Sequence, residues 1–536
     1  MKRAFFSFIF TLVFLSGALL TADSSWKGPV DIFTAQKIQS PVVAVDGSGG
    51  AVIFATVSDD SSLFYTKGAQ FLRGIPKNVH SFVPLGTDPS LSAISVNSFG
   101  NAAAVWLECN PTRSNHFVRS ALFMNGNWTN PTTISHFENF LVQNFTTPAI
   151  YLDSVNRAVA AWAGQSFVDF TFHIQEDQMT SHWQGVNPKS LAAEPETLHS
   201  SPDFLTSTVL SGSPSGKALV VWCEPVTDSL HASYYDGMSW TSRPSLSKDV
   251  CQTASLPFTA VEMNSEGNAI ILWNDARGGL SAIHFSNGSY GPAQPVYTPS
   301  SVGATLAEAA IVLNDKGNAV ALWIMQNGQN YELLASLYEK GKWSAPLTLD
   351  TSSYSLCFPS LGIDGNGTIH AVWQKTDSGG KGAIYHNIYN RSSWLKDPQL
   401  LSLPDLSTIS PRLSINHLGS ATLVWIVERG DKQTVQALYA GPQAPLSAQN
   451  FSGKKVKSSF LFQTDIINVL TWSPSSDSTV KAYHLYRRGN LIATIPAGSS
   501  LTYKDRGRKS GQKDFYQLVC VNDTGLHSEA LLLSMP

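Results

Sequence analysis

The sequence predicts an all-β protein: an eight-bladed β-propeller followed by a C-terminal β-sandwich. Three observations carry this prediction. A unit of about 50 residues recurs eight times between residues 23 and 443. The last copy lacks its final strand, and a matching spare strand begins at Trp26. After residue 445 the repeat stops, and short strands with alternating apolar residues take its place. Together these observations predict a closed ring joined to a smaller second domain.

The composition restricts the class of protein before any motif is considered. The 536 residues include 36 basic and 39 acidic side chains, a net charge of −3, and 43% are hydrophobic. Such a chain can bury a large core and is not disordered. Near-neutral charge without basic blocks argues against a nucleic-acid-binding protein. The five cysteines are too few for a disulfide scaffold, and their pairing stays open.

The first 22 residues have the organisation of a secretory signal peptide. Lys2 and Arg3 supply a basic start, residues 4–20 are apolar, and Ala22 offers a small residue for cleavage. A retained membrane anchor is the alternative, although so short an apolar run is at the limit for spanning a bilayer. No later segment is comparably long and apolar. We therefore expect an exported protein, in the periplasm, at the cell surface or in the medium, without a membrane span after cleavage.

The repeats follow the pattern Asp/Asn-x-x-Gly-x-Ala-x-x-x-Trp after a stretch of alternating apolar residues, with departures such as Ala55 in place of Trp in the first copy and Ser213 in place of Asp or Asn in the fourth. The Asp or Asn side chain can bond its own backbone, and glycine accepts a positive φ, so the pattern predicts a tight turn between two strands. The run that ends in Trp is apolar on both faces, as expected of a strand between packed neighbours. The eight turns begin at Asp46, Asn97, Asp153, Ser213, Asn264, Asn314, Asp364 and Asn416.

A second recurring element is an aromatic residue followed by proline. It predicts the outer strand of each blade, because proline is tolerated at a sheet edge. Its tryptophans are Trp128, Trp183, Trp240, Trp343 and Trp394. The segment around Trp26 is of the same type, so we expect an N-terminal strand to complete the eighth blade and close the ring. We interpret the repeated tryptophans as structural and not as a platform for sugars.

The tail, residues 446–536, resembles a fibronectin type III module. The resemblance rests on an ordered series of residues: Trp472, Tyr483, Tyr486, Arg487, Tyr503, Asp505, Tyr516, Asn522, Gly525 and Ser528. It implies a spacer, adhesion or docking module without chemistry of its own. The sequence therefore predicts three parts: a signal peptide (1–22), a propeller (23–443) and the fibronectin type III-like domain (446–536).

The propeller loosely resembles the sialidase-like superfamily. Two segments, YYDGMSWTSRP at 234–244 and YEKGKWSAP at 338–346, are similar to degenerate Asp-box turns. A sialidase site would require three arginines around the axis, a tyrosine nucleophile with an acidic partner, and an acid/base aspartate. The segment FLRGIP at 71–76 is similar to the first arginine motif but falls on an outer strand. The resemblance thus implies a shared architecture and not sialidase activity.

The first strand of each repeat indicates where a site would lie. Alternate residues on these strands form two sets. One set is bulky and apolar, and the other consists mostly of small residues, with Tyr151, Glu262 and Arg412 as exceptions. A charge near the crowded axis of a ring needs a partner, water or a ligand. Further charged residues follow the strand-ending tryptophans and are expected on one rim of the ring. These rim candidates are Glu108, Glu224, Asp275 and Arg277. A water-filled channel with paired charges is the alternative.

The sequence gives few indications of a metal, cofactor or catalytic site. The histidines lack zinc-site spacing, and the Asp-rich turns lack the carboxylates of a calcium loop, so we expect no metal and no cofactor. His370 is expected to be a buried core residue. Because no catalytic set is evident, we expect a monomeric, exported binding or adhesion protein whose rim takes a glycan or a protein partner. A glycan-active enzyme with an unrecognised acidic site and a structural component of the cell envelope are the alternatives.

Overall fold

The computed structural model describes residues 26–60, 63–82, 84, 90–110, 115–124, 126–137, 147–164, 177–184, 196–201, 205–224, 227–248, 259–299, 304–442, 445–460, 463–509, 511, 513–523, 525–528 and 530–535. These residues form strands and turns with no α-helix among them, which confirms the all-β class. The expected signal peptide lies outside them. Within the described part of the chain, no helix has the length and apolar character needed to cross a membrane.

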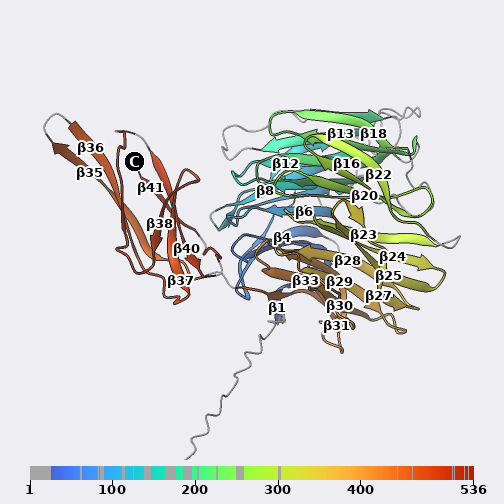
Figure 1. Cartoon of the computed structure of the whole chain (residues 1–536). Helices are drawn as coiled ribbons and strands as arrows, with labels where there is room; N and C mark the ends of the chain where they lie inside the picture. Colours follow the sequence, from blue (N-terminus) through green and yellow to red (C-terminus); the bar gives the residue numbers. More distant parts are fainter. Residues whose placement is uncertain are drawn as a thin grey trace, which may run out of the picture.

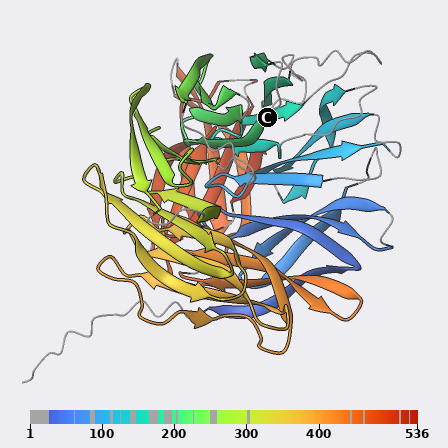
Figure 2. The ribbon, with the colours of Figure 1, turned by 90° about the vertical axis from the view of Figure 1, so that its right-hand side faces the viewer.

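Between Lys27 and Ala440 the described strands form eight antiparallel sheets arranged around a ring (Figure 2). The first four sheets comprise β2 (Lys37–Val45), β3 (Ala51–Ser58), β4 (Phe64–Leu72) and β5 (Ile75–Ser81); β6 (Ser90–Val96), β7 (Ala102–Cys109), β8 (His116–Met124), β9 (Asn127–Trp128) and β10 (Thr132–Phe137); β11 (Ala149–Leu152), β12 (Ala158–Gly164), β13 (Asp177–Gln184) and β14 (Glu196–Ser201); and β15 (Thr206–Gly212), β16 (Ala218–Glu224), β17 (Ser229–Tyr235) and β18 (Trp240–Ser247).

The other four sheets of the ring follow in the same order. They comprise β19 (Thr259–Met263), β20 (Ala269–Asn274), β21 (Leu280–Ser286) and β22 (Ser289–Tyr297); β23 (Thr305–Leu313), β24 (Ala319–Asn327), β25 (Asn330–Glu339), β26 (Lys342–Trp343) and β27 (Leu347–Ser352); β28 (Leu356–Ile363), β29 (Ile369–Thr376), β30 (Gly382–Tyr389) and β31 (Gln399–Leu400); and β32 (Ser407–Ile415), β33 (Ala421–Arg429), β34 (Lys432–Ala440) and β1 (Lys27–Ala35).

The first strand of each sheet contacts the first strand of the next, and β32 contacts β2. The inner strands therefore form a closed ring, the arrangement of a β-propeller. The Asn416 side-chain amide donates a hydrogen bond to the Asp46 carbonyl at 2.8 Å and so joins the last inner turn to the first. Asn97 and Asn264 make the corresponding bonds to the turns that follow them, at 3.1 and 3.3 Å. These contacts between turns were not predicted from the sequence.

The N-terminal strand completes the last sheet, as the spare strand at Trp26 predicted. Strand β1 pairs antiparallel with β34, and Ile32 and Phe33 join the core between the last and first sheets. Trp26 packs against the core between the seventh and eighth sheets, and its indole N–H points to His386 Nδ1 at 3.5 Å. The two ends of the ring are thus connected by backbone pairing and by buried side chains.

The predicted turn and strand positions are observed in detail. Asp46 Oδ1 accepts hydrogen bonds from the backbone N–H groups of Ser48 and Gly50, and Gly49 has a φ of +85°. In the third repeat Asn156 replaces the glycine and adopts a φ of +66°. The strand-ending tryptophans are fully buried. Trp183 is an exception to the predicted positions: it lies on β13, the third strand of its sheet, and not on the outer strand β14.

The tail forms two further sheets that share one core. The sheets have the orders β35 (Gln449–Phe460), β36 (Gln463–Ser473), β39 (Thr502–Asp505), and β38 (Asn490–Pro496), β37 (Val480–Arg487), β40 (Asp514–Asn522), β41 (Leu531–Met535). Trp472 from the first sheet packs with Tyr483 and Tyr516 from the second. The sheet containing β37 and β40 lies toward the ring, and β35 and β36 lie on the far side (Figure 1).

The tail contacts one face of the ring, that of the turns between the first and second strands. Phe99 of such a turn packs edge-on to Tyr486 of the tail, and Arg73 pairs with Asp477 at 3.6 Å. Arg73, from the segment similar to an arginine motif, is therefore far from any axial role. The opposite face carries the rim candidates. Four of the five cysteines are described, and none of these four forms a disulfide; Cys251 lies outside the described residues.

Candidate functional site

A cavity of about 530 Å³ lies on the axis of the ring, and inner strands of all eight sheets line it. The strand register brings one position of every inner strand to the same level of the cavity. We call these residues the cavity layer: Ala44, Ser95, Tyr151, Ser211, Glu262, Val312, Gly362 and Ser414. Tyr151 and Glu262 are therefore placed in the cavity, as the alternation on the first strands indicated.

The serines of the cavity layer satisfy the backbone of the neighbouring strand. Ser95, Ser211 and Ser414 each accept a hydrogen bond at 3.0 Å from a backbone N–H of the next inner strand. Buried backbone donors need such partners, so these hydroxyls are explained by the fold. Tyr151 and Glu262 make no comparable bond among the described residues, and their polar atoms are left for the contents of the cavity.

Glu262 lies on β19 and is partly accessible to the cavity. Burial within the ring disfavours the charged carboxylate and raises the pKa of Glu262 from its ordinary 4.5 to about 8. At neutral pH the group is therefore mostly protonated. A neutral carboxyl group donates one hydrogen bond and accepts others, which is the same combination that a hydroxyl group offers.

Tyr151 occupies the cavity layer two sheets away from Glu262. Its ring lies over Gly212 of the next inner strand, where a β-carbon would stand only 2.4 Å from the ring. The absence of a side chain at Gly212 is what admits the tyrosine. Burial, assisted by the charges of Asp153 and Glu262, raises the pKa of Tyr151 above its ordinary range. The phenol thus stays protonated and offers a hydroxyl group and an aromatic face.

The raised pKa of Glu262 predicts a pH-dependent stability. The folded protein holds the Glu262 proton more tightly than the unfolded chain does. The stabilisation that this proton gives the folded state is therefore fully present below pH 4.5 and is lost as the pH rises toward 8. We expect the free energy of unfolding of the Glu262→Gln variant to decline less over this interval, by a few kcal/mol at most, on the order set by the shift. Urea denaturation at pH 5 and pH 8.5 measures the difference. Equal declines in the two proteins would contradict the assignment.

Arg412 lies on the same alternation as Glu262 but two residues nearer the open rim, and it is held by the neighbouring strands. Its guanidinium lies over the Phe358 ring, 5.4 Å from the centroid. Burial lowers the pKa of Arg412, and the attraction of Glu308 opposes this shift. Glu308 in turn accepts the Phe358 N–H at 2.8 Å. Phe358 itself has a φ of +54°, a conformation that bulky residues rarely adopt and that these contacts stabilise.

Glu308 was not among the residues predicted from the sequence, although a signal was present. Glu308 precedes Ala310 and Val312 on the small alternation of its strand. With Arg412 it places two opposite charges above the cavity layer, near enough for the charge of Glu308 to affect the pKa of Arg412. Tyr151 and Glu262 remain the candidates that face the cavity without a structural partner.

Two rim candidates have structural roles. Glu108 is 1% exposed, accepts the Trp106 indole N–H at 2.7 Å and pairs with buried Arg119 at 3.1 Å. Asp275 is also 1% exposed, and one of its oxygens accepts the backbone N–H groups of Arg277 and Gly279 in a turn. Both carboxylates are thus engaged within the protein, which excludes them as ligand groups. Arg277 remains on the surface, its side chain 61% exposed.

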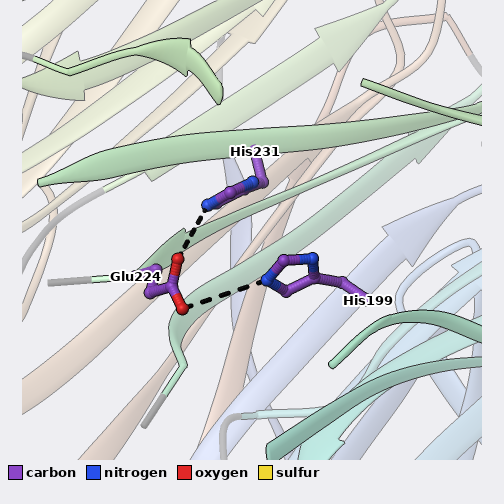
Figure 3. Close-up of side chains that lie close together, drawn as sticks. All are labelled: His199, Glu224 and His231. Carbon is purple, nitrogen blue, oxygen red and sulfur yellow. Dashed lines mark hydrogen bonds and ion pairs between the residues drawn. The ribbon is translucent and has the colours of Figure 1, made fainter. Parts of the chain in front are cut away.

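Glu224 belongs to a cluster that the sequence did not reveal. Strand pairing brings Glu224 at the end of β16 within 3.2 Å of His231 Nε2 on β17, and His199 on β14 approaches from the preceding sheet at 4.0 Å (Figure 3). Trp222 stacks on the His231 ring with a centroid distance of 5.6 Å. The two histidines are 32 residues apart in sequence, so no spacing rule could have linked them.

The ligand atoms of His199, Glu224 and His231 all lie within 4.8 Å of one another, close enough to consider a metal ion. The hydrogen bonding of His231 argues against one. Its Nδ1 accepts the backbone N–H of Ser245 at 3.1 Å, so the neutral ring carries its proton on Nε2 and donates it to Glu224. A metal ligand needs a free lone pair on that nitrogen, and metal-bound histidines usually donate from the other one. We interpret the cluster as a buried hydrogen-bonded network.

His370 is buried, as predicted, and its Nδ1 lies 3.0 Å from His386 Nε2 in the core of the seventh sheet. Burial lowers the pKa of His370 to about 4 and that of His386 to about 3. Both rings are therefore neutral at physiological pH. This pair belongs to the structural core and not to the candidate site.

No protein-family model matches the sequence, and no curated protein matches it significantly. Solved structures with some likeness include a protein of unknown function from Dyadobacter fermentans (10% identity, 67% of this chain and 97% of that chain, TM-score 0.37). Others are the intramolecular trans-sialidase from Ruminococcus gnavus in complex with oseltamivir carboxylate (11%, 77% and 97%, 0.35) and the six-bladed β-propeller lectin of the fungus Aleuria aurantia (13%, 58% and 95%, 0.32). Likenesses this low carry no argument about function.

Proposed function

We propose that this chain is an exported, non-catalytic glycan-binding protein: an eight-bladed propeller that holds a saccharide in its axial cavity, followed by a fibronectin type III-like spacer or docking domain. The observation that carries the proposal is the cavity layer. Its mostly small residues leave space at the axis, while Tyr151 and Glu262 project polar groups that the fold itself does not use. A monomer suffices for this arrangement, because all the lining residues come from one chain.

The chemistry of the cavity suits a neutral, hydroxyl-rich ligand. Its volume of about 530 Å³ lies within the range of small-molecule sites. The protonated Glu262 carboxyl and the Tyr151 hydroxyl can each donate and accept hydrogen bonds, and an aromatic face packs against the C–H surface of a sugar ring. An anionic ligand would gain nothing from these two groups, since neither carries a positive charge.

The carboxylates near the cavity favour binding over hydrolysis. Glycoside hydrolases use two carboxyl groups about 5–10 Å apart that flank the scissile bond. Among the described lining residues, Asp364 accepts the N–H groups of Asn366 and Thr368, and Asp315 accepts that of Ser265. These acids are engaged in turns at the tail-side end of the cavity. Glu262 therefore has no evident catalytic partner.

Binding should depend on the neutral form of Glu262. We expect Glu262→Ala to weaken the binding of a saccharide about fivefold to tenfold, the value of one neutral hydrogen bond. Glu262→Gln, which keeps a donor and an acceptor, should bind within a few-fold of the wild type at pH 6.5. Above pH 8 the wild type should lose affinity while Glu262→Gln does not, because only the wild-type group ionises. A glycan array identifies the saccharide, and calorimetric titration measures its affinity.

The exposed Glu266→Ala variant, altered in the turn of the same sheet, is the matched control and should bind as the wild type does. Affinity unaffected by Glu262→Ala would contradict an axial site. Turnover of any array glycan that Glu262→Gln abolishes would establish the enzymatic alternative instead. Capture of a protein partner without any glycan signal would favour a protein ligand.

A further inference from the structure

Charge is distributed unevenly between the two parts of the mature chain. Residues 446–536 carry 11 basic and 6 acidic side chains, a net charge of +5. Residues 23–445 carry 23 basic and 33 acidic side chains, a net charge of −10. The near-neutral total thus hides a basic tail attached to an acidic ring. A charge separation of this size steers each part toward partners of opposite sign.

Part of the basic charge lies on the outer face of the three-stranded sheet β35-β36-β39. Lys454 on β35 and Lys504 on β39 both pair with Val469 on β36, so the two lysines flank Val469 in one row across the sheet. Two strand spacings separate them by about 10 Å. The adjacent row is Ser452, Thr471 and Thr502. Both lysines and this polar row are exposed.

The two lysines have no structural role that would explain their position. Neither forms an ion pair with any of the residues that the structure describes. Two like charges about 10 Å apart repel and do not attract each other, so the fold gains nothing from the arrangement. Arg506, which follows Lys504 in the same segment, adds a third positive charge, partly balanced by Asp465 at 3.1 Å.

This face points away from the acidic ring. The sheet with β37 and β40 lies toward the ring, whereas β35 and β36 lie on the far side of the tail (Figure 1). The contact residue Tyr486 is on the ring-facing sheet. A partner that docks on the outer face of β35-β36-β39 therefore leaves the axial cavity and the open rim accessible.

We propose that the outer face of β35-β36-β39 docks the protein onto a linear anionic polysaccharide. Lys454 and Lys504 contact successive charged groups of the chain, and the row of hydroxyl side chains bonds to its sugars. A polysaccharide fits this face better than a lipid bilayer does. Membrane-binding surfaces combine basic residues with large apolar ones, and among the described residues the large apolar side chain most exposed here is Val456, at 36%.

Dextran sulfate is the test ligand, unmodified dextran is the neutral control, and the mature chain is used throughout. We expect the double variant Lys454→Gln/Lys504→Gln to bind dextran sulfate about tenfold to thirtyfold more weakly at 0.1 M salt. Its affinity should also fall less steeply with salt than that of the wild type, because fewer counterions are released. The control Lys432→Gln/Lys481→Gln removes the same charge from exposed positions elsewhere and should bind as the wild type does.

Equal weakening in the control variant would show that only overall charge matters and would overturn the proposal. Binding to anionic phospholipid vesicles but not to dextran sulfate would overturn it in favour of a membrane. Equal binding to unmodified dextran would also overturn it. The Glu262→Ala variant separates the two sites: it should leave dextran sulfate binding unchanged, so a failed axial site and a failed docking face give different results.

Discussion

Removal of residues 23–36 from a chain that begins at residue 23 should unfold or strongly destabilise the ring. The deletion removes β1, which pairs with β34 and buries Ile32 and Phe33 between the last and first sheets. Burial of two such side chains contributes about 3–6 kcal/mol, and the loss of the strand also exposes the edge of β34. We expect the melting temperature to fall by about 3–7 °C, or the truncated protein to aggregate.

A synthetic peptide with the sequence of residues 23–36 provides the control. Because the free edge of β34 is a template for a strand, the peptide should raise the melting temperature of the truncated protein. The same peptide with Ile32 and Phe33 replaced by serine should not. An unchanged melting temperature after the deletion would contradict closure of the ring by β1.

The second large effect is expected at the buried ion pair of the second sheet. Glu108→Ala leaves the Arg119 guanidinium, only 5% exposed, without its carboxylate and removes the acceptor of the Trp106 indole N–H. Removing one partner of a buried pair costs about 3–5 kcal/mol, because the other charge stays desolvated. Chemical denaturation of the two proteins measures this difference.

Arg429→Gln is the matched control for that measurement. Arg429 also pairs with a carboxylate, that of Asp31 at 2.8 Å, but both side chains are exposed to solvent. Its replacement should cost no more than about 1 kcal/mol. If Glu108→Ala proves as mild as Arg429→Gln, Glu108 is not a structural group and returns to the list of ligand candidates.

Local features of the fold could be predicted from the sequence because each depends on neighbouring residues. The turn at Asp46 requires an Asx residue and a glycine three positions later, and both are visible in the repeat. The spare strand at Trp26 was recognisable because the eighth repeat lacks one. Trp183 was wrongly predicted to lie on the outer strand of the third sheet. The connection between β12 and β13 is longer than the corresponding connections in the other sheets, so the number of residues between the first turn and the outer strand differs from that in the other repeats.

The candidate site was predictable only where one strand determines it. Alternation on the inner strands placed Tyr151 and Glu262 in the cavity, since side chains two residues apart share a face. Contacts between different sheets were not accessible in this way. The attraction between Arg412 and Glu308 and the approach of His199 to Glu224 depend on which positions come near each other across sheets. The position of a residue after a strand also says little about burial, as Glu108 shows.

A crystal structure of residues 23–536 with the best-bound array saccharide would show directly whether the axial cavity is the binding site. We expect the saccharide inside the axial cavity, with a hydroxyl group within about 3 Å of the Glu262 carboxyl and a ring face or hydroxyl group against Tyr151. A saccharide bound at the rim or between the ring and the tail, with Glu262 and Tyr151 contacting water alone, would contradict it.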